Sequence, residues 1–542
     1  MMGLPLALIT AALALSASAG RGATSNCSSL ANSLDITGTK IHTAELVSAG
    51  STVSIPNVDP SCGRGPQIVS TDICRISLYH STSNRSGFEM EAWLPTNWTG
   101  RFLSTGNGGL GGCIQTEDLD YAVSLGFAAV GTNNGHNGMS GSSFLHNPDV
   151  IEDFAYRALH TGVVLGKQMT RAFYGQPHTT SYYLGCSTGG RQGFKSAQSF
   201  PDDFDGIVAG APAFSFNNLT SWSCNFLPLT GPPQSATYVP AALWSTVIHA
   251  DILAQCDGLD GARDGIIEAP DRCAYDPSGL ACGANDDNNN NNSSSSGGGA
   301  CLTPAQVATV RAVYAPLLDP FDGSLVYPAM QPGSEATGLA QTYLTGHSFG
   351  AADWFQYAIY NDSPAWDPLT LAPADWRRSS ALDLFGVDTW DGDLSEFRAG
   401  GGKLLSYHGL ADSTISSNNS PRYYEHVAQT MGVAPGEMDA FYRLFRVSGM
   451  AHCGGGPGAV AIGNQGRSVE SLDPRENVVM AAVRWVEEGV APETVTGSAW
   501  VNGSREAGVA FKRRHCRWPY RNVFRGGDVG DVDAWECVGP DN

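Results

Sequence analysis

Apolar residues follow two different spacings along this chain, and the two spacings alternate. Between residues 150 and 173 they recur at helical spacing, with Ile151, Phe154, Ala158, Leu165 and Met169 near one face. Helical patterns also cover Arg191–Ser199 and Val478–Glu488. Short apolar runs predict strands at Phe127–Val130, Ser181–Leu184, Ile207–Ala209, Lys403–Tyr407 and Phe441–Val447. Strands that alternate with helices predict an α/β protein with a mostly parallel sheet covered on both faces.

The alternation breaks down between about residues 214 and 399, where the chain is rich in Trp, Pro, Asp and Gly. Sheet-like segments resume after this stretch, so it is predicted to be an insertion, and a lid over an active site is the obvious use for one. The insertion contains a run of Asn, Ser and Gly at residues 285–299, which cannot bury apolar surface and is predicted to be a surface loop. The predicted organisation is therefore a catalytic domain formed by residues 20–213 and 400–542, with a lid domain at 214–399.

The first residues have the features of a secretory signal peptide. Leu4–Leu15 is apolar, and Ala17-Ser18-Ala19 has the small-x-small pattern of a cleavage site, which predicts a signal peptide over residues 1–19. The apolar run is shorter than the roughly 20 residues that a membrane anchor needs. We therefore expect a secreted, extracellular protein.

Cysteine content and glycosylation sequons agree with that compartment. The chain has 13 cysteines, a number that is unusual in a reducing cytosol. Outside the Asn-rich run, N-x-Ser/Thr sequons occur at Asn26, Asn84, Asn97, Asn218, Asn361, Asn418 and Asn502. The formal net charge of −21 argues against nucleic acid or an anionic membrane as a partner, because both require a positive surface.

The strongest catalytic signal is the sequence Gly185-Cys186-Ser187-Thr188-Gly189. It matches the G-x-S-x-G nucleophile elbow and lies between a predicted strand and a predicted helix, as that motif requires. Such a turn raises the serine hydroxyl toward the substrate, while glycines leave room around it. The backbone N–H of Thr188 then faces the oxyanion that develops during ester cleavage. A plain Gly/Ser turn is the alternative interpretation.

A nucleophilic serine needs a base and a residue that orients the base. In the α/β-hydrolase order, the acid follows the serine and the histidine comes last. Asp412 follows one late predicted strand and His452 follows the next, so they are predicted to be the acid and the base of a triad with Ser187. His408 is a competing candidate, but it precedes the acid and is interpreted as structural.

Two cysteines adjoin the predicted triad. Cys186 precedes Ser187, and Cys453 follows His452. A disulfide would bring their Cα atoms to about 5.5–6 Å and would hold the serine turn against the histidine loop. Pairing with other cysteines is the alternative, because spacing alone does not determine connectivity.

The Cys-Ser, Asp and His-Cys arrangement resembles the tannase and feruloyl esterase family, and most closely its fungal type B feruloyl esterases. The resemblance covers essentially the whole mature chain and includes Gly106–Gly109, Gly185–Arg191, Asp205–Pro212 and Ala451–Cys453. It implies an α/β-hydrolase fold with a large inserted lid domain and hydrolysis of phenolic-acid esters. It also implies a second oxyanion donor in the Gly-rich loop, from a backbone N–H near Gly108 or Gly109.

The resemblance further implies a set of disulfides. The implied pairs are Cys27–Cys74, Cys62–Cys113, Cys186–Cys453, Cys256–Cys273, Cys282–Cys301 and Cys516–Cys537. Cys224 is left over and is expected to be a buried, inert thiol.

A cluster of carboxylates in the insertion is a candidate metal site. Asp257, Asp260 and Asp264 follow one another at spacings of three and four, with glycines that bend the loop, so their oxygens can converge on one hard cation. A solvated acidic turn is the alternative. The resemblance implies a structural calcium ion here, with the carbonyl groups of Ala262 and Ile266 as further ligands.

These observations predict a secreted serine esterase that forms an acyl-enzyme on Ser187. By resemblance, the expected substrates are ferulic, p-coumaric and caffeic esters of plant cell-wall polysaccharide, or small methyl esters. Three alternatives remain: a tannase acting on galloyl esters, a serine peptidase on the same fold, and a non-catalytic, calcium-stabilised binding glycoprotein. The insertion offers Trp354, Phe355, Tyr357, Trp366 and Trp376 as pocket residues, but ordinary lid packing explains them equally well.

Overall fold

The structure is a computed structural model that describes residues 27–30, 34, 36–283, 301–347, 350–361 and 366–540. The predicted signal peptide (1–19) and the Asn/Ser/Gly run (285–299) lie outside the described residues. At the centre of the protein is a nine-stranded sheet. Its spatial order is β1 (Thr39–Val47), β4 (Ile73–Ser81), β5 (Gly87–Pro95), β7 (Ala128–Thr132), β6 (Arg101–Thr105), β8 (Thr180–Cys186), β9 (Gly206–Gly210), β12 (Lys403–Gly409) and β13 (Tyr442–Val447).

The sheet is mixed rather than wholly parallel. From β7 through β13 all five pairings are parallel, as the alternating pattern predicts. The three pairings among β1, β4, β5 and β7 are antiparallel. This antiparallel end has polar residues at alternate positions, and its first three strands were not among the predicted ones. The α/β-hydrolase fold class is confirmed.

Helices cover both faces of the sheet because successive strand residues point to opposite sides. Ile207 of β9 packs in one apolar core and its neighbour Val208 packs in the other. The helices that contribute to the first core are α4 (Ala158–Tyr174), α5 (Thr188–Ser199) and α14 (Asn419–Met431). Those that contribute to the second are α2 (Thr116–Ser124) and α16 (Val478–Glu488). The predicted 150–173 helix is built from α3 (Pro148–Glu152), a π-helical turn at Asp153–Arg157, and α4.

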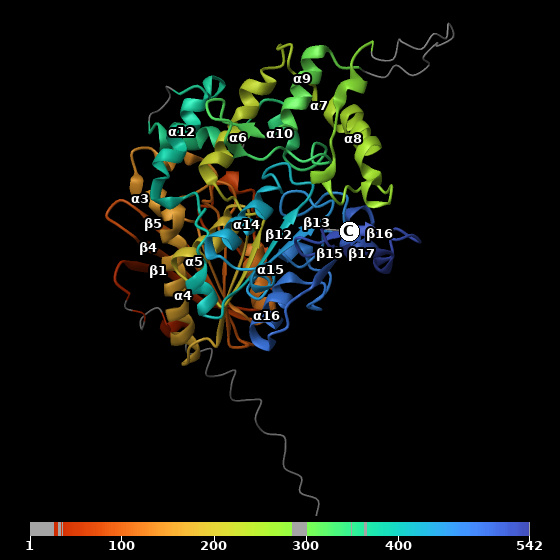
Figure 1. Ribbon diagram of the computed structural model, residues 1–542. Coiled ribbons are helices and arrows are strands. Elements are labelled where there is room, and N and C mark those ends of the chain that lie inside the picture. Colours follow the sequence, from red (N-terminus) through yellow and green to blue (C-terminus); the bar gives the residue numbers. More distant parts are fainter. Residues whose placement is uncertain are drawn as a thin grey trace, which may run out of the picture.

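We refer to residues 214–399 as the lid segment. It is mainly helical, with one two-stranded sheet of β10 (Leu317–Leu318) and β11 (Leu325–Tyr327). Its principal helices are α6 (Phe216–Thr230), α7 (Ala241–Leu243), α8 (His249–Cys256), α9 (Pro304–Val313), α10 (Ala340–Leu344), α11 (Ala351–Asp353), α12 (Pro373–Leu382) and α13 (Ser395–Ala399). Most of these helices lie together above the sheet in Figure 1.

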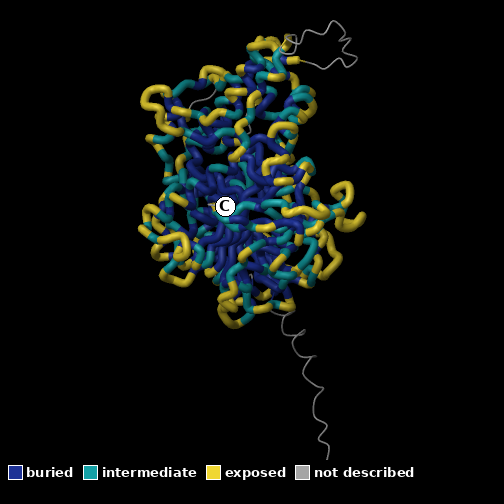
Figure 2. Tube along the Cα trace, turned by 45° about the vertical axis from the view of Figure 1, so that its right-hand side comes forward, coloured by how far each residue is buried: buried dark blue, intermediate teal, exposed yellow. Residues whose placement is uncertain are grey.

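The lid segment has an apolar core of its own. Trp354 and Phe355 are completely buried there, and Trp376 is nearly so. In Figure 2, buried chain continues from the sheet region into the lid segment, while exposed chain lies at the periphery. The lid tryptophans therefore contribute to lid packing.

Two hairpins complete the described chain. β14 (Thr494–Trp500) pairs with β15 (Val509–Cys516), and β16 (Arg521–Phe524) pairs with β17 (Trp535–Val538). A short helix, α15 (Pro435–Met438), precedes β13, and a small ladder of β2 (Thr52–Val53) with β3 (Gln67–Ile68) lies near the start of the chain.

All six implied disulfides are present in the structure. They are Cys27–Cys74, Cys62–Cys113, Cys186–Cys453, Cys256–Cys273, Cys282–Cys301 and Cys516–Cys537. Cys224 is free and buried, and burial raises the pKa of its thiol to about 12, so it stays protonated and unreactive at neutral pH. Within the described ranges, no helix combines the length and the apolar character needed to cross a bilayer.

Candidate active site

Three loops meet at the carboxyl edge of the sheet. Ser187 directly follows β8, Asp412 lies three residues after β12, and His452 lies five residues after β13. Because β8, β9, β12 and β13 run parallel, their carboxyl ends lie at the same edge, where α/β proteins build their sites. The topology thus brings together residues separated by 265 positions in the chain.

Ser187 has the strained backbone of a nucleophile elbow. Its φ of 66° and ψ of −125° fall outside the regions that residues with side chains ordinarily occupy. Glycines make the turn possible: a Cβ at Gly185 would lie 2.8 Å from the backbone of Gly189, and a Cβ at Gly189 would lie 2.8 Å from the carbonyl oxygen of Asn107. The elbow therefore requires glycine on both sides of the serine for steric reasons.

The three predicted triad side chains form one hydrogen-bonded chain. The Nε2 atom of His452 lies 2.9 Å from Ser187 Oγ, and its Nδ1 atom lies 2.7 Å from Asp412 Oδ2. Asp412 is fully buried, and His452 is only slightly exposed. This geometry lets His452 accept the hydroxyl proton of Ser187 while Asp412 holds the ring in the required tautomer.

Asp412 is stabilised as a carboxylate. Burial alone would raise its pKa, but the neighbouring charge of His452 and hydrogen bonds from His408 and His452 hold that pKa well below its usual value. Backbone N–H groups of Thr414 and Ile415 donate to Oδ1 at 2.7 and 3.0 Å. Asp412 therefore remains ionised at neutral pH.

His408 contacts the acid and not the serine. It is completely buried; its Nε2 atom lies 3.3 Å from Asp412 Oδ2, and its Nδ1 atom lies 2.7 Å from Ser420 Oγ. His408 is predicted to be structural, and its contact with the acid is an additional finding of the structure. In the sequence, the only sign of this contact is that His408 lies four residues before the candidate acid.

The disulfide between Cys186 and Cys453 joins the two catalytic loops. The Cα atoms of the two cysteines are 6.0 Å apart, across 267 positions of sequence. Cys453 itself has a positive φ of 61°, so the histidine loop is bent where the bond attaches. The disulfide therefore joins the serine loop to the histidine loop at the residues directly next to Ser187 and His452.

The Gly-rich loop lies against the start of α5. The hydroxyl of Thr188 donates to the carbonyl oxygen of Gly109 at 2.5 Å, and the side chain of Gln192 accepts from the N–H of Asn107 at 2.9 Å. Gly109 and Thr188 both line the pocket at Ser187, whereas Gly108 does not. The loop is thus fixed beside the serine by hydrogen bonds to α5, and its role as an oxyanion donor stays a prediction.

A narrow pocket of about 50 Å³ opens beside Ser187 and Thr188. Its walls come from both the catalytic part and the lid segment, and include Leu110, Phe216, Leu219, Tyr343 and Ile415. Of the insertion's five aromatic candidates, none lines this pocket within the described chain. The sequence did not identify the lining residues because they come from separate elements whose packing no local pattern specifies.

Comparison with known proteins identifies the family. The family model described as "Tannase and feruloyl esterase" matches residues 74–538. The chain belongs to this family. A relative from Aspergillus terreus, described as "Probable feruloyl esterase B-2", is 51% identical over 516 residues, which cover 94% of this chain and 95% of that protein.

Solved structures of the tannase and feruloyl esterase family have the same fold. The crystal structure of feruloyl esterase B from Aspergillus oryzae is 48% identical, covers 95% of this chain and 100% of its own, and superposes with a TM-score of 0.89. Tannin acyl hydrolase from Aspergillus niger shares the fold at 24% identity, with a TM-score of 0.72 and coverage of 95% of each chain. The resemblance inferred from the sequence is confirmed at the level of the family.

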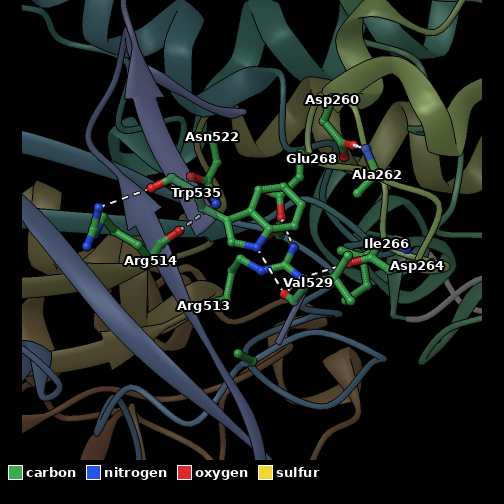
Figure 3. Close-up of polar contacts among 12 residues, drawn as sticks. Asp260, Ala262, Asp264, Ile266, Glu268, Arg513, Arg514, Asn522, Val529 and Trp535 are labelled. Carbon is green, nitrogen blue, oxygen red and sulfur yellow. Dashed lines mark hydrogen bonds and ion pairs between the residues drawn. The ribbon is translucent and has the colours of Figure 1, made fainter. Parts of the chain in front are cut away.

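The predicted calcium loop, residues 257–266, packs against the C-terminal hairpins. The Asp264 carboxylate accepts from Arg513 of β15 at 2.7 Å, and Glu268 forms a second ion pair with the same guanidinium. Arg513 lies 3.6 Å from the ring centroid of Trp535 and is almost completely buried. Figure 3 shows Arg513 between Asp264 and Glu268, with the Trp535 ring over it.

The carboxylates of this loop are oxygen donors of the kind that bind a divalent cation. Among the described residues, no three His, Cys, Asp or Glu side chains are grouped closely enough to hold a metal ion. Asp257 and Asp260 form no ion pair in that part of the chain. Burial, reinforced by the charges of Asp264 and Asp257, raises the pKa of Asp260 to about 6. Buried carboxylates without a basic partner are oxygen donors of the type calcium prefers, so their chemistry fits even though the side chains are not gathered.

A buried polar network beneath the elbow was also not foreseen. The completely buried guanidinium of Arg191 donates to the carbonyl oxygens of Ala155 and Phe154 at 2.9 and 3.1 Å. The amide of Gln192 bonds to the side chains of Asn107 and Asn134. These contacts fix the first turn of α5, and with it Ser187, to the π-helical turn and the Gly-rich loop.

Proposed function

We propose that this protein is a serine carboxylic-ester hydrolase that releases phenolic acids from their esters. The single observation that carries the proposal is the hydrogen-bonded chain from Ser187 Oγ through His452 to Asp412. Family membership and relatives described as probable feruloyl esterases support a phenolic acyl group. The expected source is plant cell-wall polysaccharide.

The reaction proceeds in two halves. Ser187 Oγ attacks the ester carbonyl carbon while His452 Nε2 takes its proton, and the carbonyl oxygen becomes an oxyanion. The backbone N–H of Thr188, together with one from Gly108 or Gly109, stabilises that charge. His452 then gives the proton to the leaving alcohol, which departs and leaves an acyl-enzyme.

The second half mirrors the first. Water attacks the acyl carbon while His452 accepts its proton, and the phenolic acid leaves as Ser187 regains that proton. Asp412 stabilises the imidazolium in both halves without taking a proton itself. Each oxyanion donor contributes about 2.7–4 kcal/mol to the rate, as expected for preorganised donors in a site sheltered from water.

The pocket beside Ser187 is proposed to hold the aromatic acyl group after it widens, because its volume of about 50 Å³ is smaller than an aromatic ring needs. Apolar side chains of Leu110, Phe216 and Ile415 can cover the faces of a planar ring. The hydroxyls of Ser223 and Thr414 also face this pocket, and the Thr414 hydroxyl is buried with no hydrogen-bond partner among the described residues. A ring substituent of the substrate can supply that missing hydrogen bond.

A substrate panel tests the proposed acyl group. We expect methyl ferulate, caffeate and p-coumarate to be hydrolysed with a much higher kcat/KM than methyl gallate, whose three hydroxyls would lie against the apolar walls of the pocket. Preferential hydrolysis of gallate would assign the protein to the tannase side of the family instead. A lack of turnover on every ester would favour the non-catalytic alternative.

Two further features belong to this proposal. The six disulfides fit an oxidising compartment, and we propose that the protein is secreted. A structural calcium ion is proposed at the 257–266 loop, held by the carboxylates of Asp257, Asp260 and Asp264 and the carbonyls of Ala262 and Ile266. It would neutralise the loop and take no part in the chemistry.

A further inference from the structure

A larger cavity, of about 670 Å³, lies at the antiparallel end of the sheet. Its walls are β1, β4 and β5, the loop at residues 53–66, and the loop at residues 133–137. These strands are the first three in the sheet order, whereas Ser187 follows the sixth. The cavity shares no lining residue with the pocket at Ser187, and its volume falls in the range typical of small-molecule sites.

The cavity is lined by one polar face of the sheet. Ser77 lies opposite Glu91, and Tyr79 lies opposite Glu89, so these four side chains project from the same face. The intervening residues, among them Ile76, Leu78 and Ala92, point to the other face and pack in the apolar core. Ser77 and Glu91 of the polar face are nearly buried, and Glu91 is held there by hydrogen bonds from Arg75 and Trp93.

Charge is balanced around the cavity. Its only charged lining residues within the described chain are Arg64, Arg75, Glu89 and Glu91. Arg75 and Glu91 form a buried ion pair at 2.8 Å, so neither is free to bind a charged ligand. The glutamates disfavour an anion, and the arginines disfavour a cation. The balance favours a neutral ligand with many hydrogen-bonding groups.

His136 adds a neutral ring to the cavity wall. It lines the cavity and is 6% exposed, and its imidazole lies beside the backbone of Asn134 and Leu110. Its ring also contacts Phe144 edge-on, with the centroids 5.3 Å apart. Burial lowers the pKa of His136 to about 4, so the ring brings no charge to the cavity at neutral pH and has one nitrogen that donates and one that accepts.

We propose that this cavity is an accessory binding site for a neutral oligosaccharide chain. Sugar hydroxyls both donate and accept, which matches the mixture of Tyr79, His136 and Asn137 in the lining. The site would hold the polymer while a different segment presents its ester to Ser187, which raises the local ester concentration. The proposed binding goes beyond ester hydrolysis and does not require it.

Binding is measured by titration calorimetry on the Ser187→Ala protein, so that no ester chemistry contributes. The probes are xylotetraose, cellotetraose and trigalacturonate. We expect heat of binding from at least one neutral oligosaccharide and none from the anionic one. Absence of binding by both neutral chains, or tighter binding of trigalacturonate, would overturn the proposal.

Two substitutions locate the site. Ser54 lines the cavity and is exposed, so Ser54→Trp fills the entrance without disturbing the core. Ser51→Trp places the same side chain three residues away, at an exposed position outside the lining. We expect Ser54→Trp to weaken oligosaccharide binding by at least tenfold and Ser51→Trp to leave it unchanged. Equal affinities in the two variants would contradict the assignment.

A subtler pair tests the hydroxyl of Tyr79. Tyr79→Phe removes one hydrogen-bonding group from the cavity, and Tyr238→Phe does the same at a lid position outside it. We expect only Tyr79→Phe to weaken binding. The expected decrease in affinity is about tenfold, because one hydrogen bond to the ligand is lost. When the catalytic Ser187 is present, both variants should hydrolyse methyl ferulate at the rate of the parent protein. Normal hydrolysis without oligosaccharide binding would refute the accessory site alone and leave the esterase proposal standing.

Discussion

Cys186 and Cys453 are bonded to each other, and each is the immediate chain neighbour of a residue in the hydrogen-bonded triad. The bond joins a loop at the end of β8 to a loop at the end of β13, two strands separated in the sheet by β9 and β12. The position of His452 relative to Ser187 therefore depends on a covalent link as well as on packing.

Removing this disulfide should lower turnover as well as stability. We expect Cys186→Ala/Cys453→Ala to lose about 2–4 kcal/mol of unfolding free energy and to show a lower kcat on methyl ferulate, because the histidine loop is freed beside the serine. Cys282→Ala/Cys301→Ala is the matched control, since that pair closes only 19 residues in the lid segment. The control should lose stability with kcat unchanged. An equal kcat in both double variants would show that the link is merely structural.

Of the two histidines near Asp412, only His452 should be essential. We expect His452→Ala to lower kcat by about 10⁴–10⁶, as removal of a triad base does elsewhere. His408→Gln should cost far less, about tenfold to a hundredfold, because His408 contacts Asp412 at 3.3 Å but makes no contact with Ser187. The measurement is kcat on methyl ferulate at saturating substrate. A larger loss from His408→Gln would reverse the assignment.

Asp388 should make the protein less stable as pH rises. Burial, reinforced by the charge of Asp383 and opposed by the N–H of Asn217, raises the pKa of this carboxyl from its ordinary value of 3.8 to about 6. The folded state thus binds the proton more tightly than the unfolded state. The resulting stability is present below pH 4 and is lost as pH rises to about 6.

Asp388→Asn should remove that dependence. The amide oxygen can still accept from Asn217, whose backbone N–H lies 2.7 Å from Oδ1. We expect the variant and the parent to have the same melting temperature near pH 4. Between pH 4 and pH 6–7, the unfolding free energy of the variant should rise relative to that of the parent by at most about 3 kcal/mol, which corresponds to a pKa shift of about two units. Melting curves across this range provide the measurement. A constant difference at every pH would contradict the raised pKa.

Calcium removal should destabilise the lid segment. We expect a chelator to lower the melting temperature of the parent, and Asp260→Asn to abolish that chelator-induced shift, because Asp260 is a proposed ligand. Asp276→Asn, at an exposed lid position outside the loop, should keep the full shift. An unchanged melt of the parent in excess chelator would exclude a bound calcium ion.

Much of the site was predictable because its signals are local. The elbow needs glycines flanking Ser187, and the triad order restricts the acid and the base to the loops after two late apolar runs. The parallel strands are continuously apolar and therefore easy to recognise, as at Ile207–Ala209. By contrast, β4 and β5 carry polar residues at every second position, and these face a cavity rather than solvent.

Other features depend on long-range packing that no local pattern encodes. Leu110, Phe216 and Ile415 meet at one pocket only after the lid segment folds onto the sheet. The tryptophans that looked suitable for a pocket are needed in the core of the lid segment, as at Trp354. The ion pairs of Arg513 with Asp264 and Glu268 join segments about 250 residues apart.

The most direct test of the account is the rate of ferulate release from methyl ferulate by Ser187→Ala, with the parent protein measured alongside and both shown to be folded by their melting curves. If Ser187 is the nucleophile, kcat should fall by a factor of about 10⁵–10⁶ while the fold stays unchanged. Turnover within tenfold of the parent would mean that another group attacks the ester, and the assigned triad would be wrong.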